Sequence, residues 1–297
     1  MPLRFAIVLL CCLLPASTPA DASMTGWMTN PALDEVSGMA ASHAHPGVLW
    51  VENDSGNPAD VYAVSPGGSL LATLHVDGVP NIDWEDFAAF DLDGHHYLIV
   101  ADTGDNGGIR KTLALHVFEE PEELHDAHAK PAWSIAFRWP DGPRDCEAIA
   151  VDVHTSSILL ITKKRVPAQL FRLPLRPTGS GTSTAELLGT LNGIPQPTID
   201  EKAAAPHYAK YLSQVTAADL APGRSSIVVL TYRRAYFYRR ATNEDWAQAV
   251  SHEPIQLSFG WLPQAEALAF ALDGRSVYVS GEHLPSPIVQ VDIPASH

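Results

Sequence analysis

Five short segments of the chain resemble one another, and each of them opens a strand-like run of residues. The segments are residues 35–40, 83–88, 145–150, 212–217 and 264–269. Aligned, they carry alanine at the sixth position and Ser37, Glu85, Glu147, Gln214 and Glu266 at the third. They recur about every 50 to 70 residues, and a repeat of this length with β-rich content is typical of the blades of a β-propeller.

Further β-rich runs follow each segment, separated by turns of glycine, aspartate, serine or proline. The second runs are residues 48–51, 97–100, 158–161, 227–230 and 277–279. A third run follows in every unit and a fourth in all but the last, whose missing strand we assign to residues 24–29. The pattern predicts an all-β fold, a β-propeller of five four-stranded blades closed by an N-terminal strand, because this closure leaves no sheet edge open.

Two other architectures also fit many short strands. The interval between Glu147 and Gln214 is the longest and has room for a sixth, degenerate blade. A two-domain β-sandwich is the second alternative. The best helical stretch, residues 200–212, lies in the same interval, and we expect it to be a loop or a single helix laid over one face.

The N-terminus has the pattern of a secretory signal. Arg4 precedes an apolar run, residues 5–14, that is too short to span a bilayer, and small residues follow it. We therefore expect residues 1–20 to be a signal peptide, with cleavage after Ala22 as an alternative, and residues 23–297 to form a single propeller domain. A short membrane anchor and a lipoprotein are the competing interpretations. The signal predicts a periplasmic or secreted protein with no membrane span in the mature chain.

Cysteine usage agrees with export to a bacterial periplasm. Cys11 and Cys12 lie in the signal, so Cys146 is the single cysteine of the predicted mature chain and has no partner for an internal disulfide. We expect Cys146 to be a small buried hydrophobic residue, with a catalytic thiol as the alternative.

The formal net charge of −15 restricts the partners that the protein can have. It argues against nucleic acid and against an anionic membrane surface. It is compatible with a protein that collects cations.

Acidic residues concentrate where the innermost strands of a propeller start and the second strands end. Both places lie at the same mouth of the central channel, so we expect their side chains to gather there. Glu85, Glu147 and Asp102 are the candidate catalytic groups. The candidate metal ligands are Asp54, Asp86, Asp102 and Asp105. Hard oxygen donors such as these suit Ca²⁺ or Mg²⁺, and the glycine-containing stretch from Asp102 to Asn106 has the oxygen density of a calcium loop.

Basic residues occupy the equivalent places in two adjacent units. These are Lys163, Lys164, Arg233 and Arg234, which we expect to bind an acidic or phosphorylated small molecule. A cation with Lys or Arg would neutralise a phosphate while a carboxylate activates water. Binding without turnover would use the same groups.

A structural interpretation competes with the functional one. The repeated third-position residues can tie neighbouring blades together, whereas the loop residues that differ between blades are the stronger functional candidates. The histidine pairs are weaker: His95 and His96 fall in a turn on the opposite face, and His125 and His128 in a polar connection. No nucleophile elbow, phosphate-cradling glycine loop or zinc-protease motif is present in the sequence.

Three stretches resemble secreted bacterial β-propeller proteins. They are SGMAAS with the following PGVLWVENDSG, then DWEDFAAF, and then YLIVADTGDN followed by Arg110. This motif-level resemblance covers mainly residues 35–120. At the level of architecture the chain is more distantly similar to TolB-like and phytase-like propellers, and the phytase-like resemblance implies calcium and phosphoester hydrolysis with carboxylates and Lys or Arg on one face.

The sequence therefore predicts an exported propeller with a charged, cation-binding channel mouth. The leading hypothesis is Ca²⁺-dependent phosphoester hydrolysis or processing of an acidic small molecule. The competing class is a non-catalytic propeller of the cell envelope that binds a ligand or an envelope protein. A lectin-like module is less well supported, because its binding residues would recur in each blade and here the loops diverge.

Overall fold

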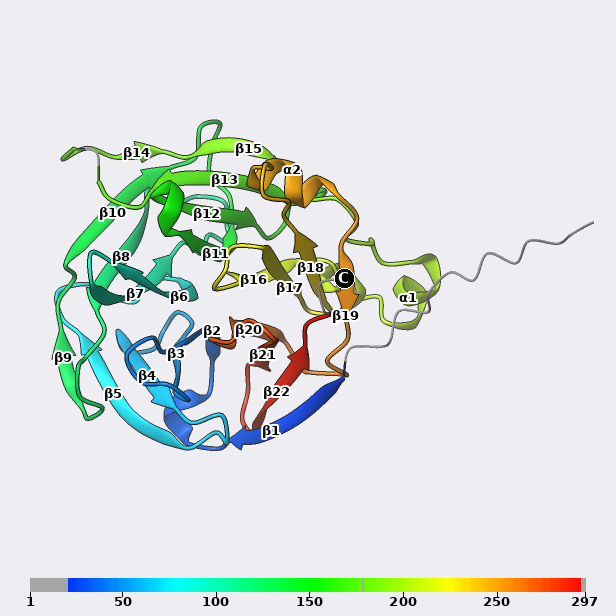
Figure 1. Cartoon of the computed structure of the whole chain (residues 1–297). Coiled ribbons are helices and arrows are strands. Elements are labelled where there is room, and N and C mark those ends of the chain that lie inside the picture. The colour runs from blue at the N-terminus through cyan, green and yellow to red at the C-terminus, as the bar shows by residue number, and fades with distance from the viewer. Residues whose placement is uncertain (1–20, 178, 295–297) are drawn as a thin grey trace, which may run out of the picture.

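The computed structural model describes residues 21–177 and 179–294 as five small β-sheets arranged around a central axis (Figure 1). The prediction of a five-bladed β-propeller is confirmed, and the described residues form neither a sixth blade nor a β-sandwich. The signal-peptide prediction for residues 1–20 lies outside the described residues.

The strands of each blade follow one another outward from the axis, antiparallel and mostly in chain order. The innermost strands are β2 (Val36–Ala41), β6 (Trp84–Leu92), β11 (Cys146–Asp152), β16 (Val215–Leu220) and β20 (Ala265–Phe270). The second strands are β3 (Leu49–Asn53), β7 (His95–Asp102), β12 (Ser157–Thr162), β17 (Ser226–Thr231) and β21 (Ser276–Gly281). The third strands are β4 (Asp60–Val64), β8 (Leu113–Glu119), β13 (Gln169–Pro174), β18 (Ala235–Arg239) and β22 (Ser286–Asp292). The fourth are β5 (Leu70–Val76), β10 (Trp133–Arg138), β15 (Glu186–Thr190) and β19 (Ile255–Leu257), and β1 (Ala22–Met28) pairs with β22 in the last sheet.

Two blades contain one more strand than the four predicted. β9 (Ala127–Ala129) pairs in parallel with β5, and β14 (Ser183–Thr184) pairs in parallel with β10. β9 belongs to the connection between β8 and β10 of the second blade and pairs with the outer strand of the first. β14 belongs to the connection between β13 and β15 of the third blade and pairs with the outer strand of the second. The extra strands cover outer edges that would otherwise expose unpaired backbone groups.

A β-bulge interrupts the innermost strand at the same place in all five blades. Its position in the fourth blade shows that the sequence alignment of the fourth repeat was wrong by two residues. The residue at the bulge is Glu85 in β6, Glu147 in β11 and Thr216 in β16. The fourth repeat is therefore residues 214–219, not 212–217. It carries Thr216 at the third position in place of Gln214, and Asp219 instead of alanine at the sixth. The strand starts late because Gln214 still belongs to a turn, in which its N–H donates to Tyr211 O at 2.8 Å.

Two buried aspartates connect the innermost strands of different blades. Asp86 accepts hydrogen bonds from the backbone N–H groups of Phe87 (2.8 Å), Ile149 (2.7 Å) and Ala218 (3.4 Å), so its carboxylate joins three blades. Asp219 accepts N–H groups in the same manner, from Leu220 at 2.7 Å and Phe270 at 2.8 Å. Sheet pairing alone leaves these backbone N–H groups around the narrow channel without partners. The two carboxylates accept their hydrogen bonds.

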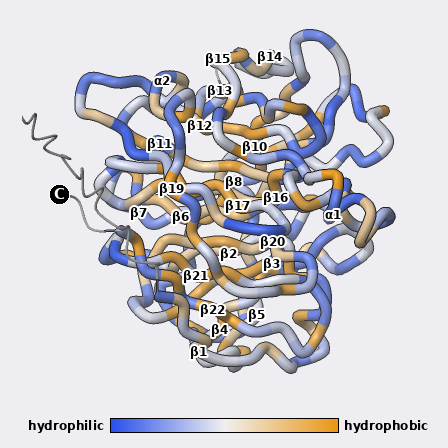
Figure 2. The backbone as a smooth tube through the Cα atoms, turned by 90° about the vertical axis from the view of Figure 1, so that its right-hand side faces the viewer, coloured by the Kyte–Doolittle hydropathy of each residue, from blue (hydrophilic) through white to orange (hydrophobic). Residues whose placement is uncertain are grey.

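The core lies between adjacent blades, where the strands carry most of the hydrophobic residues and the loops most of the hydrophilic ones (Figure 2). Large side chains such as Trp50, Trp84 and Phe171 are fully buried there. Cys146 is also buried, as expected, and burial raises the pKa of its thiol to about 12. A thiol in that state is a packing residue and not a nucleophile.

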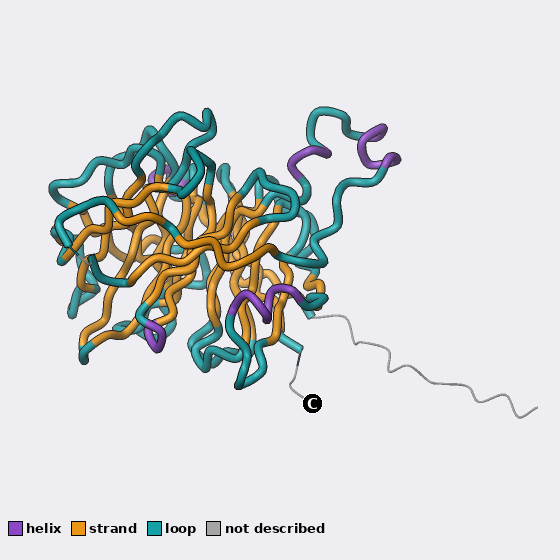
Figure 3. The backbone as a smooth tube through the Cα atoms, turned by 90° about the horizontal axis from the view of Figure 1, so that it is seen from above, coloured by secondary structure: helices purple, strands orange, loops and turns teal. Residues whose placement is uncertain are grey.

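Helices are few and short. α1 (Ile199–Ala204) starts at a capping box between Thr198 and Glu201, and the 3₁₀ turn η3 (Ala209–Tyr211) follows it. The stretch expected to hold a loop or a single helix is thus divided, and it projects from the body of the propeller (Figure 3). The others are α2 (Trp246–Ser251), η1 (Pro31–Leu33) and η2 (Val153–Thr155). None of the helices in the described residues is long and apolar enough to cross a membrane.

Candidate functional site

One mouth of the channel is formed by the starts of the innermost strands and the ends of the second strands. The register places Trp84 opposite Asp102, Cys146 opposite Thr162 and Val215 opposite Thr231. The residues just before one position and just after the other therefore meet at this mouth, as the repeat pattern predicted.

A cavity of about 400 Å³ opens at this mouth. Of the predicted site residues, it is lined by Asp54, Glu85, Glu147, Lys163 and Lys164. The other lining residues are Asn106, Tyr208, Tyr211, Gln214, Tyr232, Gln264, Glu266 and Glu282. Acidic groups outnumber the two lysines, so the cavity as a whole attracts cations.

Two groups of three carboxylates share one member at the wall of this cavity. In the first, one oxygen from each of Asp54, Asp83 and Glu85 lies within 4.8 Å of the other two. The second contains Glu85, Asp145 and Glu147, with one oxygen from each within the same limit of 4.8 Å. Because residues two apart on a strand point the same way, the starts of β6 and β11 each supply two of these acids.

Glu85 is the central member of the two groups. Burial raises the pKa of its carboxyl well above the usual value, and the neighbouring Glu147 and Asp54 raise it further. Burial likewise raises the pKa of Asp54 and Asp83. Among the described residues, Glu85 Oε1 and Glu147 Oε1 have no hydrogen-bonding partner. Buried carboxylate oxygens without a partner are costly, and a bound cation would remove that cost.

Lys163 supplies a positive charge inside the acidic wall. Its ammonium forms a buried ion pair with Glu147 and lies 5.3 Å from the centre of the Tyr232 ring. Burial alone would lower the pKa of Lys163, but Glu147, Tyr232 and Glu266 outweigh it and raise the pKa, so the ammonium stays charged. Lys164 is more exposed, pairs with Asp145 at 2.8 Å, and bonds to the side chain of Asn106 at 2.6 Å.

Three tyrosines also line the cavity, and two of them were missed in the sequence. Tyr208 and Tyr211 come from the projecting segment, and their rings lie 6.4 Å apart. Tyr211 is 6.3 Å from Tyr232, whose hydroxyl donates to Glu266 Oε1 at 2.5 Å. The position of Tyr208 and Tyr211 just before the fourth repeat could have indicated that they lie at the mouth. The segment has no strand pattern, so the sequence did not predict where it folds.

The loop from Asp102 to Arg110 is held by its own contacts. Asp102 is buried and pairs with Arg110 at 2.6 Å, and Arg110 also donates to Gly104 O at 2.7 Å. Asp105 accepts the N–H groups of Ile109 at 2.7 Å and Arg110 at 3.1 Å. Asp102 and Asp105 thus stabilise the loop beside the cavity and do not line the cavity described above.

Gly104 fits the loop closely against the acidic wall. A Cβ at this position would lie 2.1 Å from Glu85 Oε1 and 2.5 Å from the carboxyl carbon of Asp83. Only glycine lets the backbone approach both carboxylates in this way.

The remaining predicted residues lie apart from the cavity. Asp86 is at the channel axis, where both oxygens accept backbone N–H groups, a role in blade connection that the sequence did not indicate. Arg233 pairs with Glu201 of α1 at 3.1 Å, and neither Arg233 nor Arg234 lines the cavity. Arg233 therefore holds the projecting segment in place.

The donor set of the acidic wall fits a hard divalent cation. Ca²⁺ takes carboxylate and carbonyl oxygens in flexible geometry, and Asp54, Asp83, Glu85, Asp145 and Glu147 offer such oxygens close together. The absence of histidine and cysteine from both groups disfavours zinc or copper there.

Comparison of the chain with models of known protein families, and with curated proteins, finds no match. The resemblance to secreted bacterial propellers stays a prediction.

Proposed function

We propose that this protein is an exported β-propeller that binds Ca²⁺ at one channel mouth and uses the ion to hydrolyse a phosphoester of a small molecule. The observation that carries the proposal is the pair of carboxylate groups that share Glu85, with buried oxygens of Glu85 and Glu147 left unpartnered among the described residues. The N-terminal signal pattern supports export.

Each part of the mouth has a role in this chemistry. Asp54, Asp83, Asp145 and one oxygen of Glu85 would hold the cation, which would supply charge neutralisation when bound. Lys164, the more exposed lysine, binds the phosphate of the substrate. Lys163 pairs with Glu147 and opposes the rise in pKa that burial gives to that carboxyl. Glu85 accepts a proton from the attacking water, a role suited to a carboxyl whose pKa is raised by burial. Tyr208 and Tyr211 contact the organic part of the substrate.

A non-catalytic binding propeller of the cell envelope is the second candidate. Two large hydrophobic side chains are exposed on segments that lead into strands at this mouth: Ile199, 86% exposed, and Trp261, 81% exposed. Exposed apolar residues beside a charged cavity favour a protein partner. The lysines are already paired with carboxylates, which also fits binding without turnover.

One set of measurements separates the candidates. We expect hydrolysis of p-nitrophenyl phosphate in Ca²⁺ and none in a chelator, and Ca²⁺ at 100 times its Kd should stabilise the fold by about 2.7 kcal/mol. Glu85→Gln should lower kcat/KM about 100-fold or more, because it removes the general base. Glu186→Gln, which changes a surface glutamate paired with Arg172, is the matched control.

The outcomes have distinct meanings. Stabilisation by Ca²⁺ without turnover would favour the binding propeller over the hydrolase. If the melting temperature and the activity are both unaffected by chelation, the cation proposal fails.

We also infer that β1 closes the ring. Its antiparallel pairing with β22 is supported by Thr25, whose hydroxyl contacts Ile288 O of β22 at 3.1 Å and Pro66 O of the first blade at 2.7 Å. An N-terminal strand that completes the last blade would leave no open edge between the two ends of the chain.

A further inference from the structure

A second cluster of metal-ligating side chains lies at the opposite end of the channel. One nitrogen or oxygen from each of His43, Asp91 and His96 lies within 4.8 Å of the other two. His43 Nδ1 is 2.9 Å from Asp91 Oδ1, and His96 Nδ1 is 2.6 Å from the same oxygen. The sequence pointed to His96 as a turn residue on this face without assigning it a role.

The cluster spans the boundary between the first two blades. Asp91 and His96 face each other across the β6–β7 hairpin, as register partners. His43 comes from the loop between β2 and β3. Glu120, which follows β8, fixes that loop: its carboxylate accepts the backbone N–H groups of His43 and Ala44, both at 3.1 Å.

Glu120 is itself held firmly. It is buried, and its carboxylate also accepts hydrogen bonds from the Ser42 hydroxyl and from Trp50 Nε1 at 2.7 Å. The backbone at His43 is therefore set by contacts that do not involve the imidazole. Such preorganisation is what a metal site requires of its ligands.

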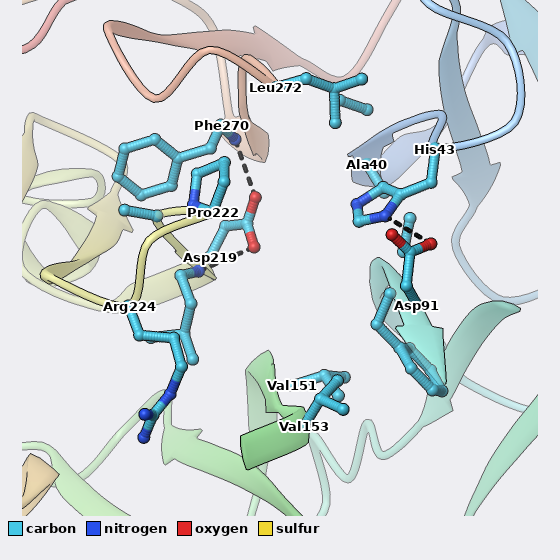
Figure 4. A pocket seen from close by; sticks show the side chains of 15 residues that line it. Ala40, His43, Asp91, Val151, Val153, Asp219, Pro222, Arg224, Phe270 and Leu272 are labelled. Atoms are coloured by element: carbon cyan, nitrogen blue, oxygen red, sulfur yellow. Dashed lines mark hydrogen bonds and ion pairs between the residues drawn. The ribbon is translucent and has the colours of Figure 1, made fainter. Parts of the chain in front are cut away.

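Two of the three ligands, His43 and Asp91, also border a cavity of about 240 Å³. His43 and Asp91 form one side, and Asp219 lies across from them, with its carboxylate held by the Phe270 N–H (Figure 4). Val151 and Leu272 contribute apolar side chains to the same cavity (Figure 4). The cluster therefore lies beside a partly open cavity that can hold a small molecule or water.

We propose that His43, Asp91 and His96 bind a zinc ion whose fourth position faces this cavity. Two imidazoles and one carboxylate are a ligand set typical of zinc with an open position. Ligand atoms around a tetrahedral zinc ion lie about 3.3 Å apart. The two imidazole nitrogens lie 2.9 Å and 2.6 Å from Asp91 Oδ1, a little closer than that spacing. The Nδ1 atoms of both imidazoles converge on Asp91 Oδ1. A zinc ion bound by both Nδ1 atoms would leave each neutral ring with its proton on Nε2.

The site differs in chemistry from the acidic mouth. Nitrogen ligands favour zinc over Ca²⁺, so the two sites can be filled independently. The proposal therefore does not depend on the proposed function.

Zinc titration by calorimetry, with saturating Ca²⁺ and the chain expressed without a polyhistidine tag, tests the site. We expect one tight zinc ion for the unaltered protein. His96→Gln should weaken its Kd about 100-fold, because loss of a ligand costs at least as much as loss of an outer contact. His95→Gln is the matched control, since His95 is the neighbouring exposed histidine and is outside the cluster.

Two further variants make the result decisive. His43→Gln should weaken binding as His96→Gln does, and both should remove the tetrahedral Co²⁺ absorption seen with the unaltered protein. His128→Gln tests the other close histidine pair, His75 and His128, whose rings lie 4.9 Å apart. Unchanged zinc binding in His96→Gln, or an equal loss in His95→Gln or His128→Gln, would overturn the proposal.

Discussion

At the scale of single residues, the acidic mouth is organised around the buried pair of Lys163 and Glu147. Both side chains are less than one tenth exposed. A buried ion pair adds little net stability compared with an apolar pair, but either charge left alone is very costly. The pair is therefore best understood as a fixed charge in the wall and not as a source of stability.

Lys163→Met should destabilise the fold by about 3 kcal/mol in the presence of a chelator, because it leaves Glu147 buried without its partner. The double variant Lys163→Met with Glu147→Met should recover most of that loss. Urea unfolding of the two single variants and the double variant measures the coupling between the side chains. Additive effects of the two substitutions would contradict a buried ion pair.

At the scale of elements, the bulge and the projecting segment decide which residues reach the mouth. The repeat pattern located the innermost strands well, since alternation and small sixth-position residues are local signals. It misplaced the fourth strand by two residues. The N–H groups of Leu212 and Gln214 bond back to the carbonyl oxygens of Ala209 and Tyr211 in η3, so these two residues are not yet part of the strand. Tyr208 and Tyr211 reach the cavity only because that segment folds back over the mouth, which no local pattern encodes.

The seam between β1 and the first blade gives a prediction at this scale. A Cβ on Gly26 would lie 2.2 Å from the backbone of Gly67, so Gly26→Ala must push β1 away from the turn. We expect a loss of about 1–3 kcal/mol in unfolding free energy, as for other overpacked sites. Gly223→Ala, where a Cβ meets nothing within 4 Å, is the control. Equal stability of both variants in urea would show that this seam does not hold the ring together.

At the scale of the whole molecule, a ring of five blades gathers buried acids at its axis and at one mouth. Burial raises the pKa of Glu52, Glu85, Asp86 and Glu266, and it raises the pKa of Asp219 to about 7. Each carboxyl binds its proton more tightly in the folded than in the unfolded chain. The folded protein therefore holds more protons above the unfolded pKa, and its stability falls as pH rises.

For Asp219 the window runs from about pH 4, its unfolded pKa, to about pH 7. Asp219→Asn should reduce the loss of stability between pH 5 and pH 8, measured by urea unfolding with a chelator present. The size of the change is a few kcal/mol at most, about 1.4 kcal/mol for each pH unit of the window. A pH dependence identical to that of the unaltered protein would show that Asp219 titrates normally.

The sequence alone predicted five blades, with a sixth left open, the starts of four of the five innermost strands, and the gathering of acids at one mouth. These follow from local periodicity and from the regular return of the chain in a propeller. Only the tertiary structure decided which acids share a cavity. Asp86, Asp102 and Asp105 carry the same carboxylate group as Asp54 and Glu85. Their carboxylates nevertheless bind backbone N–H groups or Arg110 and do not line the cavity at the mouth. Partners from distant parts of the chain set the role of each carboxylate, and the pairing of His43 with Asp91 across two blades has the same origin.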